Sequence, residues 1–135
     1  MDHPNLHIIY KFFEAYGRQD PVAIRKVMAE DATWTARGRH PLAGIRRGLP
    51  EVLEFFDQMG AIMGKSYVNV VKLVLGANDD YVIECQHVRT NRADGNNLDH
   101  LVCVLWRFAD GKIVEGTHFF ADPEQVDGFF SAVTK

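Results

Sequence analysis

Three histidines in the second half of the chain, His87, His100 and His118, are the residues whose chemistry stands out. Each lies in a segment rich in β-branched and aromatic residues, which is typical of strands. Imidazole has an unperturbed pKa of about 6.5, so a partly buried histidine stays mostly neutral near pH 7 and can accept or donate a proton. One such group can remove an acidic proton beside a carbonyl while a second donates to the developing enolate. We therefore predict all three as catalytic residues; a structural histidine, satisfied by a backbone carbonyl or a hydroxyl, is the alternative at each position.

The register of one predicted hairpin decides which of these side chains share a face. Strands are expected at Tyr81–Arg92 and Leu98–Phe108, and Asp94-Gly95 between them favours a two-residue turn because glycine accepts a positive φ. Such a turn pairs position 87 with 102 and position 89 with 100, and cross-strand partners point to the same side. Cys85, His87, Arg89 and His100 then share one face with Val102, and the family resemblance described below implies that this face points inward. A slip of one residue turns Glu84, Gln86 and Val88 inward instead. The first register is preferred because Tyr81, Ile83 and Cys85 form the more core-like set.

Helices precede most of the expected sheet. Apolar residues at helical spacing predict helices at Leu6–Tyr16 and Leu49–Met63, and Asp20-Pro21 and Asp122-Pro123 mark the starts of two more. The other strands are expected at 32–36, 66–75 and 112–121, and the basic, glycine- and proline-containing segment 37–48 is expected to be a loop. Helices followed by an antiparallel meander predict an α+β fold.

Composition bounds the class of protein. The chain has 135 residues, of which 47% are hydrophobic, and a formal charge of −3, so we expect one domain, 1–135, with one core and no nucleic acid as partner. No run approaches the ~20 apolar residues of a membrane span, and the N-terminus lacks a signal region, so we expect no membrane partner and a cytoplasmic location. The two cysteines, Cys85 and Cys103, are expected to be buried thiols, with a bridge across the hairpin as the alternative.

Three local patterns, taken in order, carry a resemblance to a known family. They are Glu30–Trp34 after the second helix, Pro41–Gly44 followed by Arg47-Gly48, and Asp110–Glu115 followed by Phe119–Asp122. With the element order, they resemble the SnoaL-like family of the nuclear transport factor 2-like superfamily, which includes ketosteroid isomerases and polyketide cyclases. The resemblance implies a cone-shaped curved antiparallel sheet, an α+β barrel. Three helices from the N-terminal half and a short C-terminal helix would enclose a hydrophobic pocket with it, usually in a homodimer. It implies no single activity, because this fold hosts enzymes and binding proteins alike.

The chain departs from the ketosteroid isomerases at each of their functional positions. The resemblance places the family's tyrosine at Phe12, its base aspartate at Ala36 and its protonated aspartate at Val104. All three functional groups are missing, so steroid isomerisation by that route is not expected.

The same resemblance sets the predicted pocket wall. The ligand-binding residues are expected to be Trp34, Tyr67, Arg89, Val102, Val104, Trp106 and Phe120. No metal site is expected, because the histidines do not follow a recognised ligand spacing. No cofactor is expected either, because the chain lacks a glycine-rich phosphate loop. The outer face of the sheet, with Val68, Val70, Val82, Val88 and Leu101, is expected to form a homodimer interface.

Three functions remain open from the sequence. The first is a cofactor-independent isomerase, cyclase or dehydratase that uses histidine acid–base chemistry on a small apolar carbonyl compound. The second is a binding protein that holds such a ligand without converting it. The third is a dimerisation module whose cavity is filled by its own side chains. Pocket volume separates them, because a cavity below ~100 Å³ could hold neither a substrate nor a bound ligand, and functional pockets usually run to ~300–1,000 Å³.

Overall fold

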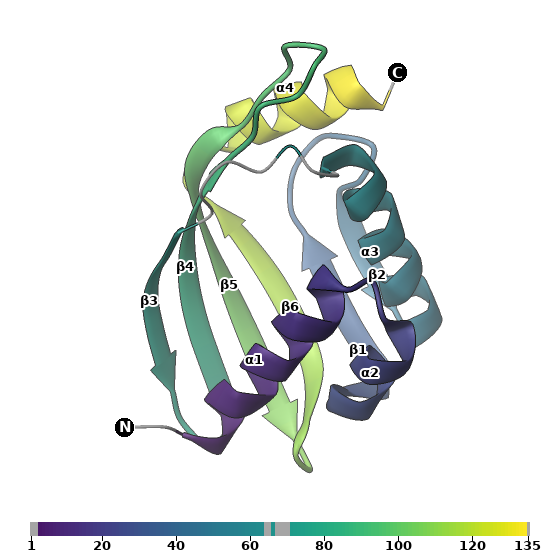
Figure 1. The fold of residues 1–135 in the computed structure, drawn as a ribbon, viewed down its shortest axis with the longest axis vertical. Helices are drawn as coiled ribbons and strands as arrows, with labels where there is room; N and C mark the ends of the chain where they lie inside the picture. Colours follow the sequence, from purple (N-terminus) through teal and green to yellow (C-terminus); the bar gives the residue numbers. More distant parts are fainter. Residues whose placement is uncertain (1–2, 64–65, 67–70, 135) are drawn as a thin grey trace.

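The computed structural model describes residues 3–63, 66 and 71–134, and within these ranges it contains four helices and six strands (Figure 1). The helices are α1 (Pro4–Gly17), α2 (Pro21–Val27), α3 (Leu49–Met63) and α4 (Pro123–Val133). The strands are β1 (Met28–Ala36), β2 (Gly44–Arg47), β3 (Val71–Ala77), β4 (Tyr81–Arg89), β5 (Asp99–Ala109) and β6 (Lys112–Phe120). The predicted α+β class is confirmed.

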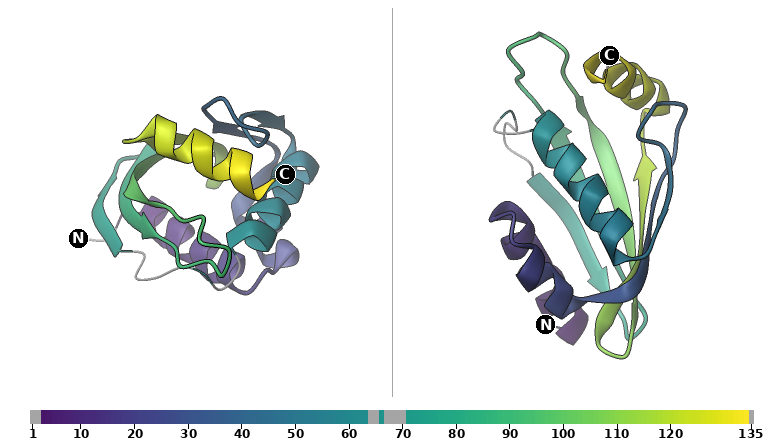
Figure 2. Two further views of the ribbon diagram at one scale, coloured as in Figure 1. Left: turned by 90° about the horizontal axis from the view of Figure 1, so that it is seen from above. Right: turned by 90° about the vertical axis from the view of Figure 1, so that its right-hand side faces the viewer.

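The strands form one curved sheet in the order β2-β1-β6-β5-β4-β3. The sheet is mixed rather than purely antiparallel, because the first strand, β1, pairs in parallel with the last, β6. This pairing joins segments that are far apart in the chain, so local sequence patterns do not predict it. The edge strands β2 and β3 do not pair with each other, so the sheet curves without closing into a barrel (Figure 2).

Two short side chains fix the starts of helices as the sequence predicts. The Asp20 carboxylate accepts a hydrogen bond from the backbone N–H of Ala23 at 3.1 Å, and the Asp122 carboxylate accepts one from Gln125 at 3.1 Å. Each cap satisfies a backbone donor that the first turn of a helix leaves unpaired. Asp122 therefore ends the last strand segment and sets the direction of α4 across the open end of the sheet (Figure 1).

The segment 37–48 contains a short strand, which the sequence analysis did not predict. β2 pairs antiparallel with β1, with Arg46 opposite Trp34. Arg46 donates to the backbone carbonyl of Leu42 at 2.6 Å, and its guanidinium lies 4.5 Å from the ring centre of Phe55. The sequence does not indicate this strand, because the charged ends of its basic residues suggest a solvated loop.

The helices α1, α2 and α3 lie on the concave side of the sheet (Figure 2). Their aromatic residues meet those of the strands in one core. The ring centre of Phe12 from α1 lies 4.9 Å from Trp106, and that of Phe56 from α3 lies 5.1 Å from Trp34. The two tryptophan rings are themselves 5.0 Å apart. These edge-to-face contacts hold the helices at a fixed distance from the sheet and leave space further along the concave face.

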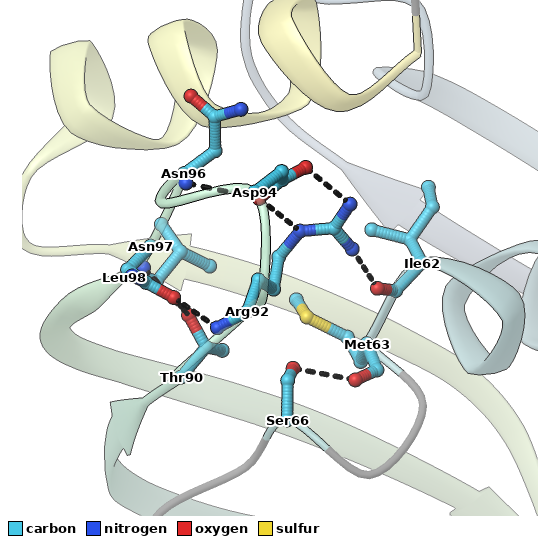
Figure 3. Close-up of polar contacts among 9 residues, drawn as sticks. All are labelled: Ile62, Met63, Ser66, Thr90, Arg92, Asp94, Asn96, Asn97 and Leu98. Carbon is cyan, nitrogen blue, oxygen red and sulfur yellow. Dashed lines mark hydrogen bonds and ion pairs between the residues drawn. The ribbon is translucent and has the colours of Figure 1, made fainter.

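The hairpin of β4 and β5 has a register one residue away from the preferred prediction. Gln86 stands opposite Val102, and Val88 stands opposite His100. Thr90 and Leu98 close the loop, since the Thr90 N–H donates to the Leu98 carbonyl at 3.0 Å and the Leu98 N–H donates to the Thr90 hydroxyl at 2.9 Å (Figure 3). An odd number of residues, 91–97, lies between them, whereas the predicted turn at 94–95 leaves an even number. The odd loop turns the side chains of β4 to the opposite face.

Polar contacts hold this loop in place. The Asn97 side chain accepts from the Thr90 hydroxyl at 3.0 Å and from the backbone N–H of Arg92 at 2.6 Å. Arg92 also pairs with Asp94 at 2.8 Å and donates to the carbonyl of Ile62 at the end of α3 (Figure 3). Bonds within the loop and one bond to α3 therefore stabilise a connection that is longer than the predicted two-residue turn.

The register also changes the predicted dimer face. Val82 and Val88 are buried on the concave side, so their expected place on the outer face is wrong. Leu101 does lie on the outer face, where it is 46% exposed. Val68 and Val70 lie outside the described residues.

Candidate functional site

The observed register decides which predicted site residues reach the concave face. His100 points inward as expected, but Cys85, His87 and Arg89 point to the outer face, so their predicted inward placement is wrong. Glu84, Gln86 and Val88 take their place, as the slipped register provided. On the outer face Cys85 and Cys103 stand directly opposite each other as free thiols, with their Sγ atoms 2.8 Å apart.

His87 and Arg89 belong to a surface cluster around one carboxylate. The Nε2 atom of His87 lies 2.5 Å from Asp99 Oδ1, and the Nε atom of Arg89 lies 3.8 Å from Asp99 Oδ2. The hydrogen bond from His87 lowers the pKa of the Asp99 carboxyl below its ordinary value. Both predicted residues are therefore engaged on the side of the sheet that faces away from the cavity.

The concave side holds two neighbouring pockets, called here the inner lobe and the outer lobe of the cavity. The inner lobe, between α1 and the sheet, has a volume of about 110 Å³ and includes Trp34, Trp106 and Val104 in its wall. The outer lobe, toward α4, has a volume of about 90 Å³ and is lined in part by Val102 and Phe120. Four residues line both lobes: Phe55, Met59, Gln86 and His118. The cavity is thus mostly apolar, with polar side chains at the junction of its lobes.

His118 occupies this junction in a defined tautomer. The indole N–H of Trp34 donates to Nδ1 of His118 at 3.2 Å. An indole nitrogen is only a donor, so Nδ1 must be the unprotonated nitrogen and Nε2 must carry the hydrogen. Desolvation by burial, with a smaller effect of His100, lowers the pKa of His118 to about 4. His118 is therefore a neutral imidazole near pH 7 whose Nε2–H is available as a hydrogen-bond donor.

Gly116 makes this arrangement possible. It lies opposite Trp34 in the parallel pairing of β1 and β6, two residues before His118. A Cβ atom at position 116 would lie 2.3 Å from a ring carbon of Trp34, well inside contact distance. The absence of a side chain lets the indole lie over the strand, with its N–H directed at His118.

His100 is the second histidine in the cavity wall. It is only 8% exposed, it lines the outer lobe, and its Nδ1 atom is buried without a hydrogen-bond partner among the described residues. Burial lowers the pKa of His100, while the nearby carboxylates of Asp122 and Asp99 act in the opposite direction. Neighbouring carboxylates therefore stabilise the imidazolium form of His100. His118 has no such stabilisation, because the charged group that acts on it is another histidine, His100.

Phe120 lies between the two histidines. Its ring centre is 5.6 Å from that of His118, with the planes 16° apart, and 5.7 Å from that of His100. The ring forms an apolar floor with one imidazole at each side. A flat molecule resting on this floor would have the fixed donor of His118 at one end and the ring of His100 at the other.

A buried polar chain on β4 and β5 forms another part of the wall. Glu84 is completely buried, and its Oε1 atom accepts from the indole N–H of Trp106 at 3.0 Å. Its Oε2 atom accepts from the side-chain amide of Gln86 at 3.1 Å. Glu84 and His118 both stand opposite Val104 in their respective pairings, so they lie in one row on either side of a short apolar side chain. The sequence pointed to Glu84 and Gln86 only through the alternative register of the hairpin, which turns them inward.

The remaining predicted residues fall in three groups. Trp34, Val102, Val104, Trp106 and Phe120 line the cavity, as the predicted positions require. The ketosteroid isomerase positions Phe12, Ala36 and Val104 also lie in its wall. Tyr67 lies outside the described residues. The sequence analysis missed His40, which comes from the loop before β2, stacks on Phe130 at 4.8 Å and lines the outer lobe.

Two further properties follow from the described residues alone. Residues 3–63, 66 and 71–134 contain no group of three or more His, Cys, Asp or Glu side chains arranged to hold a metal ion. In the same part of the chain, every helix falls short of the length and apolar character that crossing a membrane requires.

Comparison with known proteins assigns the chain to one family. The model of the SnoaL-like domain matches residues 9–116. The chain belongs to the SnoaL-like family. An uncharacterised protein of Mycobacterium tuberculosis strain H37Rv is 28% identical over 130 residues, which cover 96% of this SnoaL-like chain and 98% of the relative.

Solved structures agree with the family. Bal32a, from a soil-derived mobile gene cassette, superposes with a TM-score of 0.83 and 25% identity over 94% of this chain and 96% of its own. A protein from Jannaschia sp. CCS1 assigned as a SnoaL-like polyketide cyclase superposes with a TM-score of 0.74 and 16% identity, and the match covers 98% of both chains. At that identity the second similarity concerns the SnoaL-like fold alone.

Proposed function

We propose that this SnoaL-like protein is a cofactor-independent enzyme that moves protons on a compact, mostly apolar carbonyl compound, as an isomerase, cyclase or dehydratase does. The observation that carries the proposal is the pair of histidines in one cavity. Trp34 fixes His118 as a donor, while His100 offers a buried nitrogen without a partner in the described chain. Burial lowers the pKa of both histidines, and only at His100 do neighbouring carboxylates, those of Asp122 and Asp99, act against this effect.

The two histidines would divide the chemistry between them. His100 takes a proton from the carbon beside the carbonyl, and the electron pair of that C–H bond moves onto the carbonyl oxygen as an enolate. The Nε2–H of His118 donates to that oxygen, and donors aimed at developing charge stabilise the transition state in a site that excludes water. Asp122 and Asp99 stabilise the imidazolium that His100 becomes.

The fate of the enolate decides the type of reaction. If His100 returns the proton to a different carbon, the product is an isomer of the substrate. If a hydroxyl leaves from the next carbon with that proton, the products are an unsaturated carbonyl compound and water. If the enolate attacks a second carbonyl of the same molecule, a new C–C bond closes a ring, and the resulting alkoxide takes back the proton from His100. Each route conserves its atoms and electrons and uses only proton transfers at the histidines.

The cavity limits the size of the substrate. The lobes of about 90 and 110 Å³ lie below the ~300–1,000 Å³ of many ligand pockets. An apolar cavity of ~150 Å³ is sufficient for benzene, so a ligand of one ring or two fused rings would have to occupy both lobes together. A four-ring steroid would not fit, in agreement with the residues at the ketosteroid isomerase positions.

The second candidate function is a binding protein or a dimerisation module that does not convert its ligand. The small lobes favour it, as does the replacement of the ketosteroid isomerase groups by Phe12, Ala36 and Val104. Native mass spectrometry of the freshly purified protein separates the candidates. A retained small carbonyl compound that wild type converts and His118→Ala does not would support the enzyme. A retained compound that remains unchanged would support the binding protein, and wild-type conversion undiminished in His118→Ala would contradict the proposed role of this residue.

We also propose a homodimer formed through the outer face of the sheet. Ile83, Leu101 and Phe119 are each 45–46% exposed on that face, on three neighbouring strands. Exposed apolar side chains gathered on one face are typical of an interface. The cavity lies on the opposite side of the sheet, so each subunit keeps its own site.

A further inference from the structure

We propose that Gln86 recognises a hydroxyl group on the ligand, so that the substrate is a hydroxylated carbonyl compound and not a simple ketone. This proposal rests on the proposed function for the carbonyl group. The hydroxyl group is inferred separately, from the buried chain formed by Trp106, Glu84 and Gln86.

The first step concerns Glu84, whose two oxygens both act as acceptors. Oε1 takes the indole N–H of Trp106 and Oε2 takes an N–H of the Gln86 amide. Indole nitrogen only donates, so the Trp106 contact fixes the orientation of the carboxyl group. Glu84, on β4, is completely buried, so its side chain cannot turn toward solvent.

The second step concerns the Gln86 amide. Its NH₂ group must face Glu84, because an oxygen of Gln86 at that position would meet another acceptor. The carbonyl oxygen, Oε1, therefore points away from Glu84. No described residue donates a hydrogen bond to it, and it is not among the fully buried unpaired atoms, which are His40 Nε2 and His100 Nδ1.

The third step places this acceptor in the cavity. Gln86 lines both lobes, as His118 does, and the rest of the shared wall comes from the apolar side chains of Phe55 and Met59. The junction thus offers one acceptor, Gln86 Oε1, and one donor, His118 Nε2–H. A hydroxyl group is the small donor that satisfies Gln86, and a carbonyl oxygen is the acceptor that satisfies His118.

Glu84 is then a positioning residue, and the chain predicts a specific response to its loss. A glutamine at position 84 has both a donor and an acceptor, so the Gln86 amide is no longer held in one orientation. The preference for a hydroxylated ligand would fall, although the shape of the cavity is retained. A residue that only supports the fold would change stability without changing this preference.

The test measures dissociation constants for 2-tetralone and for the isomeric hydroxy-2-tetralones, which carry one hydroxyl on the aromatic ring, from quenching of the fluorescence of the two tryptophans. Wild type is expected to bind at least one hydroxy isomer about tenfold more tightly than 2-tetralone, the effect of one well-placed hydrogen bond. Gln86→Leu is expected to lose that ratio and to keep its affinity for 2-tetralone. Glu84→Gln is expected to reduce the ratio. Gln58→Leu, the same change at an exposed position on α3, is the matched control and is expected to keep it.

The outcomes separate this proposal from the proposed function. Hydroxyl recognition is wrong if wild type shows no preference among the probes, if none of them binds, or if Gln86→Leu keeps the preference. The two proposals can fail separately. If binding prefers a hydroxylated probe and this preference depends on Gln86, but the protein exchanges no C–H proton of any probe, then hydroxyl recognition is supported and the proposed enzyme is contradicted.

Discussion

Acid is expected to destabilise the protein in a way that depends on His118. Burial holds the pKa of His118 at about 4, while the same side chain titrates near 6.5 in an unfolded chain. Between these values the unfolded chain binds a proton that the folded protein does not. The contribution of the neutral His118 to the free energy of unfolding is therefore complete above pH 6.5, and it falls as the pH drops toward 4. At about 1.4 kcal/mol for each factor of ten, the loss between pH 7 and pH 4 is about 3 kcal/mol.

Urea unfolding at a series of pH values, followed by tryptophan fluorescence, measures this effect. His118→Gln removes the titrating group and keeps an oxygen that can accept from Trp34. The stability of wild type relative to this variant is expected to fall by about 3 kcal/mol from pH 7 to pH 4. His40 and His100, whose pKa values are also lowered by burial, contribute equally to both proteins.

His7→Gln supplies the control, because His7 is exposed on α1 and the chemical change is the same. Its stability is expected to follow that of wild type at each pH. Parallel curves for wild type and His118→Gln would refute the reasoning. A titration of the His118 ring near pH 6.5 by nuclear magnetic resonance would refute it as well, because the imidazole would then not be held neutral by its surroundings.

Three further predictions concern the outer face and the packing beneath the site. Mild hydrogen peroxide is expected to join Cys85 and Cys103 of one subunit in a disulfide, with the two thiol sulfurs oxidised and the peroxide reduced to two waters, because their Sγ atoms are 2.8 Å apart. A non-reducing tryptic map should then show peptide 73–89 linked to peptide 93–107, and bonds between subunits would contradict the expectation. Light scattering at micromolar concentration is expected to show a dimer that Leu101→Glu converts to a monomer of 15.3 kDa; a monomeric wild type would disprove the interface. Gly116→Ala is expected to lose about 1–3 kcal/mol in urea unfolding, because its methyl group would lie 2.3 Å from an indole carbon. Gly128→Ala, which meets nothing within 4 Å, is the control, and equal stability of the two variants would be the contrary result.

The parts of the fold that could be predicted from sequence are those set by local patterns. Apolar spacing located α1 and α3, and Asp20 and Asp122 marked helix starts that their side chains do cap. The family resemblance placed Val102, Val104 and Trp106 on the inner face of β5, where they line the cavity. The same resemblance extended this alternation to His118. The aromatic wall of the cavity follows from these signals.

The parts that sequence could not supply depend on single residues acting over a distance. The hairpin register follows from the bonds between Thr90 and Leu98 and from Asn97, which together close an odd-numbered loop where Asp94-Gly95 suggested an even turn. This one difference moved His87 out of the site and brought Glu84 and Gln86 into it. The tautomer of His118 depends on Trp34, a contact between residues 84 positions apart. No local pattern encodes such a contact.

The most direct test of the central claim is the exchange of the acidic C–H protons of 2-tetralone and of the hydroxy-2-tetralones for deuterium in buffered D₂O, followed by proton nuclear magnetic resonance. Wild type is expected to raise the exchange rate above that of buffer at a saturable site. His100→Gln is expected to abolish this increase, because the base is lost. His118→Gln is expected to lower the saturated rate about 10²-fold or more, because the enolate loses its hydrogen-bond donor. A wild-type rate equal to that of buffer, or variants as active as wild type, would contradict the account.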